Sequence, residues 1–580
     1  MKHVDLLTEL KRSLSEAVSE ALRIRGMDLD PGAIDVRDRV QKGFGDLSTP
    51  SVIKAAASEG LDPREVGEGV ASLVRIEMVD RVEAVNGYLN FYLDWDAFLP
   101  QLIEDIISSG REFGRAGYRG KLVLEHTSVN PTGPIGIHRS RNSIIGDSLC
   151  RIMEYSGWKV VRHYLLNDSG SNATKVLWGT RKGLSSEQLR STYEKYASKG
   201  DFRTFFAYVP ANARAEDDPR VEEEISELEA SSHSDQEVLE ELRSLSKKCL
   251  EGQLETLKRL DIEFDEIMPE STFLPVLPDI LERLRSRDLI VDVGDGSIGL
   301  DLSTVGLTRR KTKYLTLVKG NGSSTYTLRD IAYHEWKFRD GDMFITVLGE
   351  DHKREFVELK AILELLGHDE DLRAAFHSFV SYAGGKMSTR AGKTVPLDLI
   401  IDDAVDRSME EVKKRRPELS SERMREIAEQ VGKGAIKFNI LKVDPHKSME
   451  FRWEEAIDFT GDSSAYVQYA CARCAGILGN ADPTQIGDIA PLASPEEREL
   501  AWALARIPSV IQRSSAEMKP NYIAEHAIEV ATLFSKFYMQ HRVLQVDEPL
   551  RSSRIALVRS VQTALSLLLE LLGVNAPEEI

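Results

Sequence analysis

Hydrophobic and polar positions repeat with helical spacing over most of the chain, and strand-like runs are confined to shorter stretches. Residues 4–22 carry apolar side chains at helical intervals, which predicts an amphipathic first helix. Asp62 followed by Pro63 predicts another helix start, because Asp caps free N–H groups and proline fits the first helical position. Residues 82–93 place β-branched and aromatic side chains around an Asn-Gly pair, which predicts a hairpin. Residues 1–115 are therefore expected to form a small α+β domain.

The stretch from residue 120 to residue 170 predicts a strand, a loop, a helix and a second strand. An apolar run at residues 122–124 suits a buried strand, and the Gly/Pro-rich residues 130–134 interrupt any regular element. Apolar side chains recur at helical spacing from Arg141 onward, and a second apolar run covers residues 160–165. Such a βαβ unit can hold a ligand phosphate at the N-terminus of its helix. A crossover that binds no nucleotide would show the same pattern, so this stretch alone leaves the ligand open.

Three later regions complete the predicted organisation. Residues 344–348 form a continuous apolar run typical of a central parallel strand, and polar residues 349–352 follow at its carboxyl end, where open α/β sheets bind ligands. Between about 181 and 260 the chain is polar and helical, which predicts an insertion that is a solvated pair of helices without a specific function. From residue 396 to residue 580 only helical periods occur. We therefore expect an α/β domain over residues 116–395, followed by an all-α domain.

Composition favours a soluble protein of the cytoplasm. A chain of 580 residues is long enough for three or four domains with their own cores. No run of about 18 apolar residues occurs, so we expect no membrane span, and residues 1–12 lack the pattern of a signal peptide. Four cysteines are too few for a disulfide framework and favour a reducing compartment. Cys471 and Cys474 form a CxxC pair without a second pair or a histidine cluster, so no metal site is predicted.

The net charge of −19 arises from 75 basic and 94 acidic residues. Binding to nucleic acid depends on neutralising phosphates, so this sum taken alone argues against a nucleic-acid partner. Acidic residues gather between 216 and 229, however, and a large chain can carry a local basic face. The net charge therefore leaves the partner open.

Two further stretches concentrate charged and hydroxyl side chains. Tyr326, Arg329 and Asp330 lie within residues 324–333, and a carboxylate beside a tyrosine can accept a guanidinium through paired, charge-assisted hydrogen bonds. A neighbouring Asp and Arg on a surface helix would give the same pattern with little effect on stability. Residues 384–392 read GGKMSTRAG, which predicts a mobile, positively charged loop suited to a triphosphate, or else a plain surface loop.

Three of these stretches together resemble the signature regions of archaeal arginyl-tRNA synthetases, which are class I aminoacyl-tRNA synthetases. The similar residues are EHTSVNPTGP at 125–134, YTLRDIAY at 326–333 and KMSTR at 386–390. Residues 465–473 are also similar to the start of the family's anticodon-binding helices. The resemblance thus covers nearly the whole chain in the family's order.

One departure from the family pattern falls at the start of the predicted helix. Gly136 takes the place of a family histidine, His138 that of a glycine and Arg139 that of a second histidine. In the family the glycine lets adenine lie against the backbone, and an imidazole there would crowd it. The exchange motivates a second hypothesis, a catalytically impaired tRNA-binding paralogue of the same fold, although Asp330 and Lys386 are retained. A third hypothesis, a class I synthetase for another amino acid, is opposed by the two carboxylates assigned below, which favour a cation.

The resemblance implies a multidomain α/β and α fold. It consists of a class I Rossmann-like nucleotide-binding catalytic domain with the helical insertion, an N-terminal α+β domain that contacts tRNA, and a C-terminal all-α anticodon-binding bundle. The implied activity is the ATP-dependent attachment of L-arginine to tRNA(Arg) through an arginyl-adenylate, with release of pyrophosphate and AMP. ATP would enter with Mg²⁺ as a substrate, and no tightly bound cofactor is expected. We expect a cytoplasmic monomer with tRNA(Arg), L-arginine and ATP as partners and no membrane association.

The resemblance also assigns roles to individual residues. Those expected to bind ATP are Pro131, Thr132, Gly133, Pro134, Gly136, His138, Arg139, Asn142, Lys386 and Met387. Those expected to bind arginine are Glu125, Asn130, Tyr326, Asp330, Asp351 and His352. Those expected to act in catalysis are Lys386, Ser388, Arg390 and His138. Glu125 and Asp330 would hold the guanidinium of arginine, and Lys386 would stabilise the charge that develops on the departing pyrophosphate.

Overall fold

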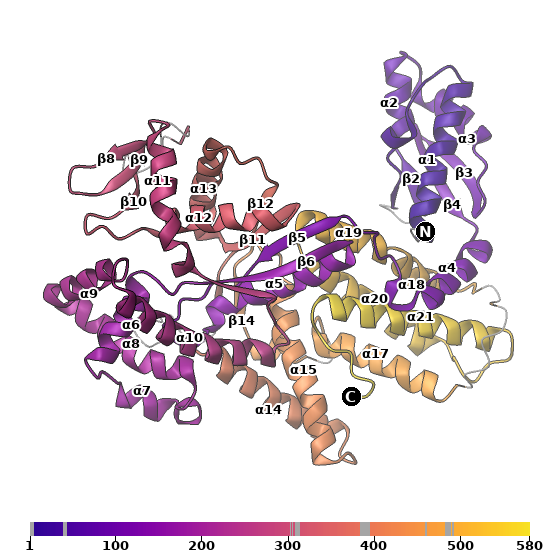
Figure 1. Ribbon diagram of the computed structural model, residues 1–580. Helices are drawn as coiled ribbons and strands as arrows, with labels where there is room; N and C mark the ends of the chain where they lie inside the picture. Colours follow the sequence, from indigo (N-terminus) through magenta and orange to yellow (C-terminus); the bar gives the residue numbers. More distant parts are fainter. Residues whose placement is uncertain are drawn as a thin grey trace.

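The computed structural model shows three units in chain order, an N-terminal α+β unit, a central α/β unit and a C-terminal helical unit (Figure 1). It describes residues 5–38, 43–301, 303, 306–307, 314–382, 395–458, 461–481, 489 and 492–580. Among these residues no helix has the length and apolar character needed to cross a membrane.

The N-terminal unit combines helices with a small antiparallel sheet. Its elements are α1 (Leu6–Ile24), β1 (Arg37–Asp38), β2 (Leu47–Thr49), α2 (Ser51–Ser58), α3 (Pro63–Leu73), β3 (Val79–Val85) and β4 (Tyr88–Leu93). The strands lie in the order β1-β2-β4-β3. The predicted hairpin is confirmed, since Val85 pairs with Tyr88 across the turn. The predicted helix start is also confirmed, because the Asp62 carboxylate accepts a hydrogen bond from the Arg64 N–H at the start of α3.

The central unit is built on a five-stranded parallel sheet in the order β12-β11-β5-β6-β7. The strands are β5 (Gly120–Glu125), β6 (Trp158–Leu166), β7 (Glu266–Pro269), β11 (Met343–Gly349) and β12 (Leu372–His377). Strand β11 pairs in parallel with both β5 and β12, which confirms the prediction of a central parallel strand. The predicted βαβ unit is confirmed as well, because helix α5 (Ile137–Tyr155) connects β5 to the parallel strand β6.

Helix α5 begins earlier than the apolar pattern indicates. The pattern starts at Arg141, whereas the helix starts at Ile137 with Gly136 as its N-cap residue. The first turn carries His138 and Arg139, which line the cavity described below and therefore break the apolar repeat. Most of the helix is buried, polar positions included, because both the sheet and the C-terminal helices pack against it.

The predicted helical insertion is confirmed, but the expectation of a solvated helix pair is wrong. The insertion consists of α6 (Ser171–Arg181), α7 (Glu187–Thr192), α8 (Gly200–Asp217), α9 (Pro219–Ser231) and α10 (Gln236–Arg259). Phe202, Phe205 and Phe206 on α8 are buried in a core of the insertion's own. On α10 the buried Gln253 donates a hydrogen bond of 2.8 Å to the carbonyl oxygen of Gly133. The insertion therefore supports the loop that follows β5.

A second sheet and three helices complete the central unit. Strands β8 (Ile290–Asp292), β9 (Ile298–Asp301) and β10 (Tyr314–Val318) form an antiparallel sheet that is separate from the parallel one. Figure 1 shows it on the side of the central unit away from the C-terminal helices. The helices are α11 (Leu277–Arg285), α12 (Tyr326–Lys337) and α13 (Lys353–Leu366). The loop from β10 leads directly into α12, which places the residues of the second signature at a helix N-terminus.

The regular elements of the C-terminal unit are helices apart from one short strand, as far as its described residues go. Its longer helices are α14 (Leu397–Arg415), α15 (Ser421–Leu441), α17 (Ser464–Gly479), α18 (Pro495–Ala505), α19 (Ile507–Glu517), α20 (Asn521–Gln540) and α21 (Leu550–Leu571). A short strand, β14 (Met449–Phe451), pairs in parallel with β13 (Val380–Tyr382) of the central unit, so the expectation of an all-α region from residue 396 is wrong at this point. Three residues are too few to leave an alternating pattern in the sequence.

Helix α5 joins the central unit to the C-terminal unit through buried polar contacts. Lys437 Nζ on α15 lies 3.1 Å from Asp147 Oδ2 on α5 and donates a hydrogen bond of 2.9 Å to the carbonyl oxygen of Gly573. The Ser148 hydroxyl donates a hydrogen bond of 3.0 Å to the carbonyl oxygen of Leu571. The helix that presents its first turn to the cavity is thus fixed to both units.

Candidate active site

A cavity of about 520 Å³ lies at the carboxyl ends of β5 and β11, where the first turns of α5 and α12 also meet. This edge is where parallel α/β sheets bind their ligands. Nine of the predicted site residues line the cavity together: Glu125, Asn130, His138, Arg139, Asn142, Tyr326, Asp330, Asp351 and His352. The structure therefore brings the first and second signature stretches to one place, although they lie far apart in the chain.

Five predicted ATP contacts lie behind the cavity wall: Pro131, Thr132, Gly133, Pro134 and Gly136. These residues are buried, and their loop is held from behind by the insertion. A side chain at Gly133 would bring a Cβ atom to 2.7 Å from the ring of Phe205, so α8 packs closely against this loop. Only glycine fits the loop at this approach.

Four predicted residues lie outside the described part of the chain: Lys386, Met387, Ser388 and Arg390. The chain that follows them is placed against α5. The Ile137 N–H donates to the Val395 carbonyl oxygen at 3.1 Å, and the Leu397 N–H donates to the Ile135 carbonyl oxygen at 2.7 Å. The described chain therefore resumes, at Val395, beside the first turn of α5.

Glu125 ends β5 and already has a cationic neighbour. Its Oε2 atom lies 2.8 Å from Lys337 Nζ and 3.4 Å from the hydroxyl of Thr346. Lys337 is 1% exposed and Glu125 is 6% exposed, so this ion pair is shielded from water. Lys337 was not among the predicted site residues. Its spacing from Asp330 was the available signal, because residues seven positions apart on a helix share a face.

Asp330 is joined to the same ion pair through His334. The ring atom Nδ1 of His334 lies 3.1 Å from Asp330 Oδ1, and its Nε2 lies 3.1 Å from Lys337 Nζ. An ammonium group can only donate, so Nε2 accepts from Lys337 and Nδ1 carries the proton, which is donated to the backbone carbonyl oxygen of Asp330 at 2.9 Å, close to the carboxylate. Counted formally, two carboxylates, one ammonium and this imidazole carry a charge of −1, which suits one monovalent cation.

Tyr326, the first residue of α12, is stacked rather than free. The guanidinium carbon of Arg329 lies 4.8 Å from the centre of its ring. Gly170, which begins α6 with a φ of +87°, lies so close that a Cβ atom there would be 3.2 Å from Arg329 Nη2 and 3.7 Å from the Tyr326 hydroxyl. The start of α6 and the first turn of α12 thus hold the ring in the cavity wall.

Two asparagines stiffen the loop around the cavity. Asn142 accepts a hydrogen bond of 2.6 Å from the Thr127 N–H and donates one of 2.8 Å to the Val347 carbonyl oxygen. This brace holds Thr127 at a φ of +65°, which is unusual for a β-branched residue. Asn130 accepts a hydrogen bond of 3.1 Å from Asn167. The side chain of Asn142 is therefore engaged with the backbone, whereas the amide N–H groups of Asn130 have no acceptor among the described residues and can serve a ligand.

Three histidines of the cavity wall have a buried ring nitrogen without a hydrogen-bond partner among the described residues: His126, His138 and His377. Burial lowers the pKa of His126 and of His138 to about 4, and the charge of Arg139 adds to the effect at His138. Burial also lowers the pKa of His377. All three are neutral at pH 7 and can offer hydrogen bonds rather than positive charge. His126 and His377 were not predicted.

Asp351 and His352 lie at the open side of the cavity. They belong to a short 3₁₀ helix, Glu350–His352, directly after β11. Their side chains are 55% and 58% exposed, and His352 Nε2 lies 3.9 Å from Asp351 Oδ2. An ion pair of this length at such exposure contributes little to stability. These two residues are therefore available to a ligand that enters from solvent.

Comparisons with known proteins agree with this geometry. Three family profiles match in order: "Arginyl tRNA synthetase N terminal domain" at residues 8–93, "tRNA synthetases class I (R), catalytic domain" at 102–453, and "DALR anticodon binding domain" at 467–580. The arginine–tRNA ligase of Methanocella arvoryzae is 36% identical over 100% of both chains. That of Methanocaldococcus jannaschii is 34% identical over 99% of both chains.

Solved structures show the same fold. The arginyl-tRNA synthetase of Thermus thermophilus superposes with a TM-score of 0.81 at 26% identity, over 98% of this chain and 100% of that one. The enzyme from Plasmodium falciparum gives a TM-score of 0.75 at 17% identity over 100% of both chains. With matching profiles along its length and relatives above 30% identity over the whole chain, this protein belongs to the arginyl-tRNA synthetases, a family of class I aminoacyl-tRNA synthetases.

Proposed function

We propose that the cavity binds L-arginine through Glu125 and Asp330 and presents its carboxylate to ATP. The observation that carries this proposal is the formal charge of −1 on a group of four side chains, of which Glu125, His334 and Lys337 are buried and Asp330 is accessible, since one guanidinium would neutralise it. Asn130 has an amide donor left for the backbone end of the amino acid, and Tyr326 offers a ring and hydroxyl beside the guanidinium. The activity is the ATP-dependent attachment of arginine to tRNA(Arg).

The chemistry requires no side-chain nucleophile. An oxygen of the arginine carboxylate attacks the α-phosphorus of ATP, the bond to the β-phosphate oxygen breaks, and pyrophosphate leaves with the developing charge. The 3′-terminal ribose hydroxyl of tRNA then attacks the arginyl carbonyl, and AMP leaves. Alignment and charge stabilisation supply the rate. We assign the charge stabilisation to Lys386 and Arg390, with Met387 and Ser388 in the same loop, and hydrogen bonding to the nucleotide to His138 and Arg139.

The remaining assignments concern the metal, the nucleic acid and the assembly state. Mg²⁺ enters with the phosphates of ATP, as is common for this ion. The N-terminal unit contacts the outer corner of tRNA and the C-terminal helices bind the anticodon; the profile matches at residues 8–93 and 467–580 support this division. We further propose that the protein is a monomer in the cytoplasm. The relatives and the site give no support to the alternative of an impaired paralogue.

ATP–pyrophosphate exchange tests the proposal directly. The assay is run with tRNA present and compares arginine with lysine, citrulline and an amino-acid mixture without arginine. Exchange that depends on arginine, with citrulline inactive, is the expected result, because citrulline matches the shape of arginine without its charge. Equal exchange with lysine would overturn the assignment of a guanidinium site. Charging of total tRNA with labelled arginine then tests the second step, and light scattering after gel filtration tests the monomer.

A further inference from the structure

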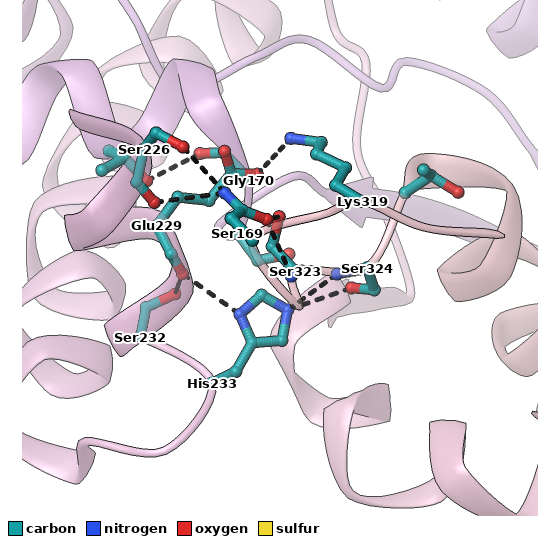
Figure 2. Close-up of polar contacts among 12 residues, drawn as sticks. Ser169, Gly170, Ser226, Glu229, Ser232, His233, Lys319, Ser323 and Ser324 are labelled. Carbon is teal, nitrogen blue, oxygen red and sulfur yellow. Dashed lines mark hydrogen bonds and ion pairs between the residues drawn. The ribbon is translucent and has the colours of Figure 1, made fainter. Parts of the chain in front are cut away.

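The helical insertion touches the loop that leads into Tyr326. His233 lies in the turn between α9 and α10, and Ser324 lies two positions before Tyr326 in the loop from β10 to α12. Figure 2 shows the imidazole of His233 pointing at Ser324, with Glu229 of α9 and Lys319 of the loop nearby. The two segments are 91 positions apart in the sequence at this contact.

The hydrogen bonds of His233 define its tautomer. Its Nε2 atom lies 3.3 Å from the backbone nitrogen and 3.1 Å from the hydroxyl oxygen of Ser324. A backbone N–H can only donate, so Nε2 accepts and the proton resides on Nδ1, which lies 3.1 Å from the Glu229 carbonyl oxygen. Burial lowers the pKa of His233, which agrees with a neutral ring. The imidazole thus connects the end of α9 to the end of the loop that leads from β10 into α12.

Two further contacts hold the same loop to α9. Lys319 Nζ lies 2.7 Å from Glu229 Oε1, and the Glu229 side chain is 4% exposed. Asn321 donates a hydrogen bond of 2.8 Å to the Ser226 hydroxyl. The loop is therefore fixed at three positions to α9 and the turn that follows it, which a solvated appendage would not require.

Ser324 passes these contacts on to the arginine site. Arg329 Nη1 donates to the carbonyl oxygen of Ser324 at 2.6 Å and to its hydroxyl oxygen at 2.9 Å. Arg329 is 1% exposed, and its Nε atom lies 2.9 Å from Oε1 of the buried Glu270. The same guanidinium is stacked on the ring of Tyr326. A shift of Ser324 would therefore move Arg329, and Tyr326 with it.

We propose that His233 is a positioning residue for arginine: the turn between α9 and α10 fixes Ser324, and through Ser324 and Arg329 it fixes the Tyr326 ring against the substrate. The inference rests on the proposed role of Tyr326 in orienting the guanidinium. The helical insertion is then a supporting element of the amino-acid site, and its effect is specific to arginine rather than to ATP.

Three substitutions of His233 test which ring atom matters. His233→Ala should raise the KM for arginine about five- to tenfold in pyrophosphate exchange, the effect of losing one or two buried hydrogen bonds, with little change in the KM for ATP. His233→Gln should restore most of the affinity, because the glutamine carbonyl oxygen can occupy the Nε2 position and accept from Ser324. His233→Asn should not, because asparagine reaches only the Nδ1 position. Equal KM values for Gln and Asn would overturn the proposal.

Controls separate this inference from the proposed function. Tyr326→Ala is measured in parallel: an unchanged KM for arginine there would refute the role of Tyr326 itself, whereas an increase there without one in His233→Ala would refute only the positioning role. Lys182→Met removes an exposed ion pair to Glu224, also on α9, and should leave both KM values unchanged. If His233→Ala does not fold, Lys319→Met is measured instead, because it loosens the same loop from α9. A raised KM for arginine would support the positioning of Tyr326 by the insertion, and an unchanged KM would overturn it.

Discussion

Lys337 Nζ lies 2.8 Å from Glu125 Oε2, and both side chains are shielded from water. A carboxylate expected to meet a cationic substrate thus has a permanent cationic partner. The pair orients the Glu125 carboxylate, so that it is not an isolated buried charge before arginine binds. His334 extends the same arrangement to Asp330.

Removal of the lysine should therefore cost both stability and affinity. Lys337→Met leaves the Glu125 carboxylate buried without its partner and should lower the free energy of unfolding by about 3–5 kcal/mol. The double variant Lys337→Met with Glu125→Gln should recover much of that stability while arginine affinity stays low. Urea unfolding of the parent, the single variant and the double variant measures the first effect, and pyrophosphate exchange measures the second. If Lys337→Met has the same free energy of unfolding as the parent, the buried ion pair does not contribute to stability as described.

Neutralising either carboxylate of the arginine site should weaken arginine binding, and Glu125→Gln should also lower stability, because it leaves the buried Lys337 without its ionic partner. Glu125→Gln and Asp330→Asn each remove one charge that faces the guanidinium, and each should lower kcat/KM for arginine by roughly 10- to 100-fold, the effect of losing a hydrogen bond to a charged group. Steady-state exchange kinetics at varied arginine give the values. Glu241→Gln, which breaks an exposed pair with Arg181, is the matched control. If Glu241→Gln lowers kcat/KM for arginine by a similar factor, Glu125 and Asp330 cannot be assigned to the guanidinium.

The exchange of Gly136 and His138 relative to the family pattern can be reversed in one double variant. Gly136→His with His138→Gly should retain or raise activity, because adenine would then meet a glycine instead of an imidazole. The backbone permits it, since Gly136 has a φ of −85°, which any residue adopts. The KM for ATP is the measurement. A large loss of activity would mean that the nucleotide site of this chain has adapted to His138.

Buried histidines should make the fold sensitive to mild acid. Burial holds the pKa of His126, His138 and His163 at about 4, below the ordinary value near 6.5. The unfolded chain therefore binds more protons than the folded one between these values, so stability is fully present above pH 6.5 and falls as the pH drops toward 4. Unfolding at pH 5 should take up to about three protons from these groups. Urea midpoints measured at pH 5, 6 and 7 test this.

The contribution of one histidine to this slope can be isolated. His163→Gln removes a ring that contacts the Tyr333 hydroxyl and should flatten the pH dependence, even if it lowers stability at pH 7. His352→Gln serves as the control, because its side chain is exposed. Identical slopes in parent and His163→Gln would show that this histidine does not titrate as described.

Elements whose pairing partners are close in the sequence could be predicted from local sequence pattern. The hairpin was indicated by an Asn-Gly pair among β-branched and aromatic residues, the helix of the βαβ unit by its apolar period, and the central strand by a continuous apolar run, and pairing confirms all three. The gathering of nine predicted residues around one cavity came from the resemblance, because nothing in the local pattern places Glu125 near Asp330.

Long-range polar contacts were the part that the sequence could not reveal. Lys337 looks like an ordinary surface lysine until β5 brings Glu125 beside it. The insertion looked solvated because its charged residues outnumber its apolar ones, yet Gln253 reaches Gly133 and His233 reaches Ser324. A polar side chain gives no sign in the sequence of whether its partner is water or a distant backbone group.

Helix α5 has one end in the cavity and its flank against the C-terminal helices, where Asp147 meets Lys437 and the Gly573 carbonyl oxygen. The central unit and the C-terminal unit of this chain are consequently not structurally independent of each other. A fragment that ends at residue 453 would expose the flank of α5, the helix that carries His138. It would also lack Gly573, whose carbonyl oxygen accepts a hydrogen bond from Lys437. A change in the C-terminal helices at this contact would therefore require a matching change on α5, so the two units are expected to evolve together here.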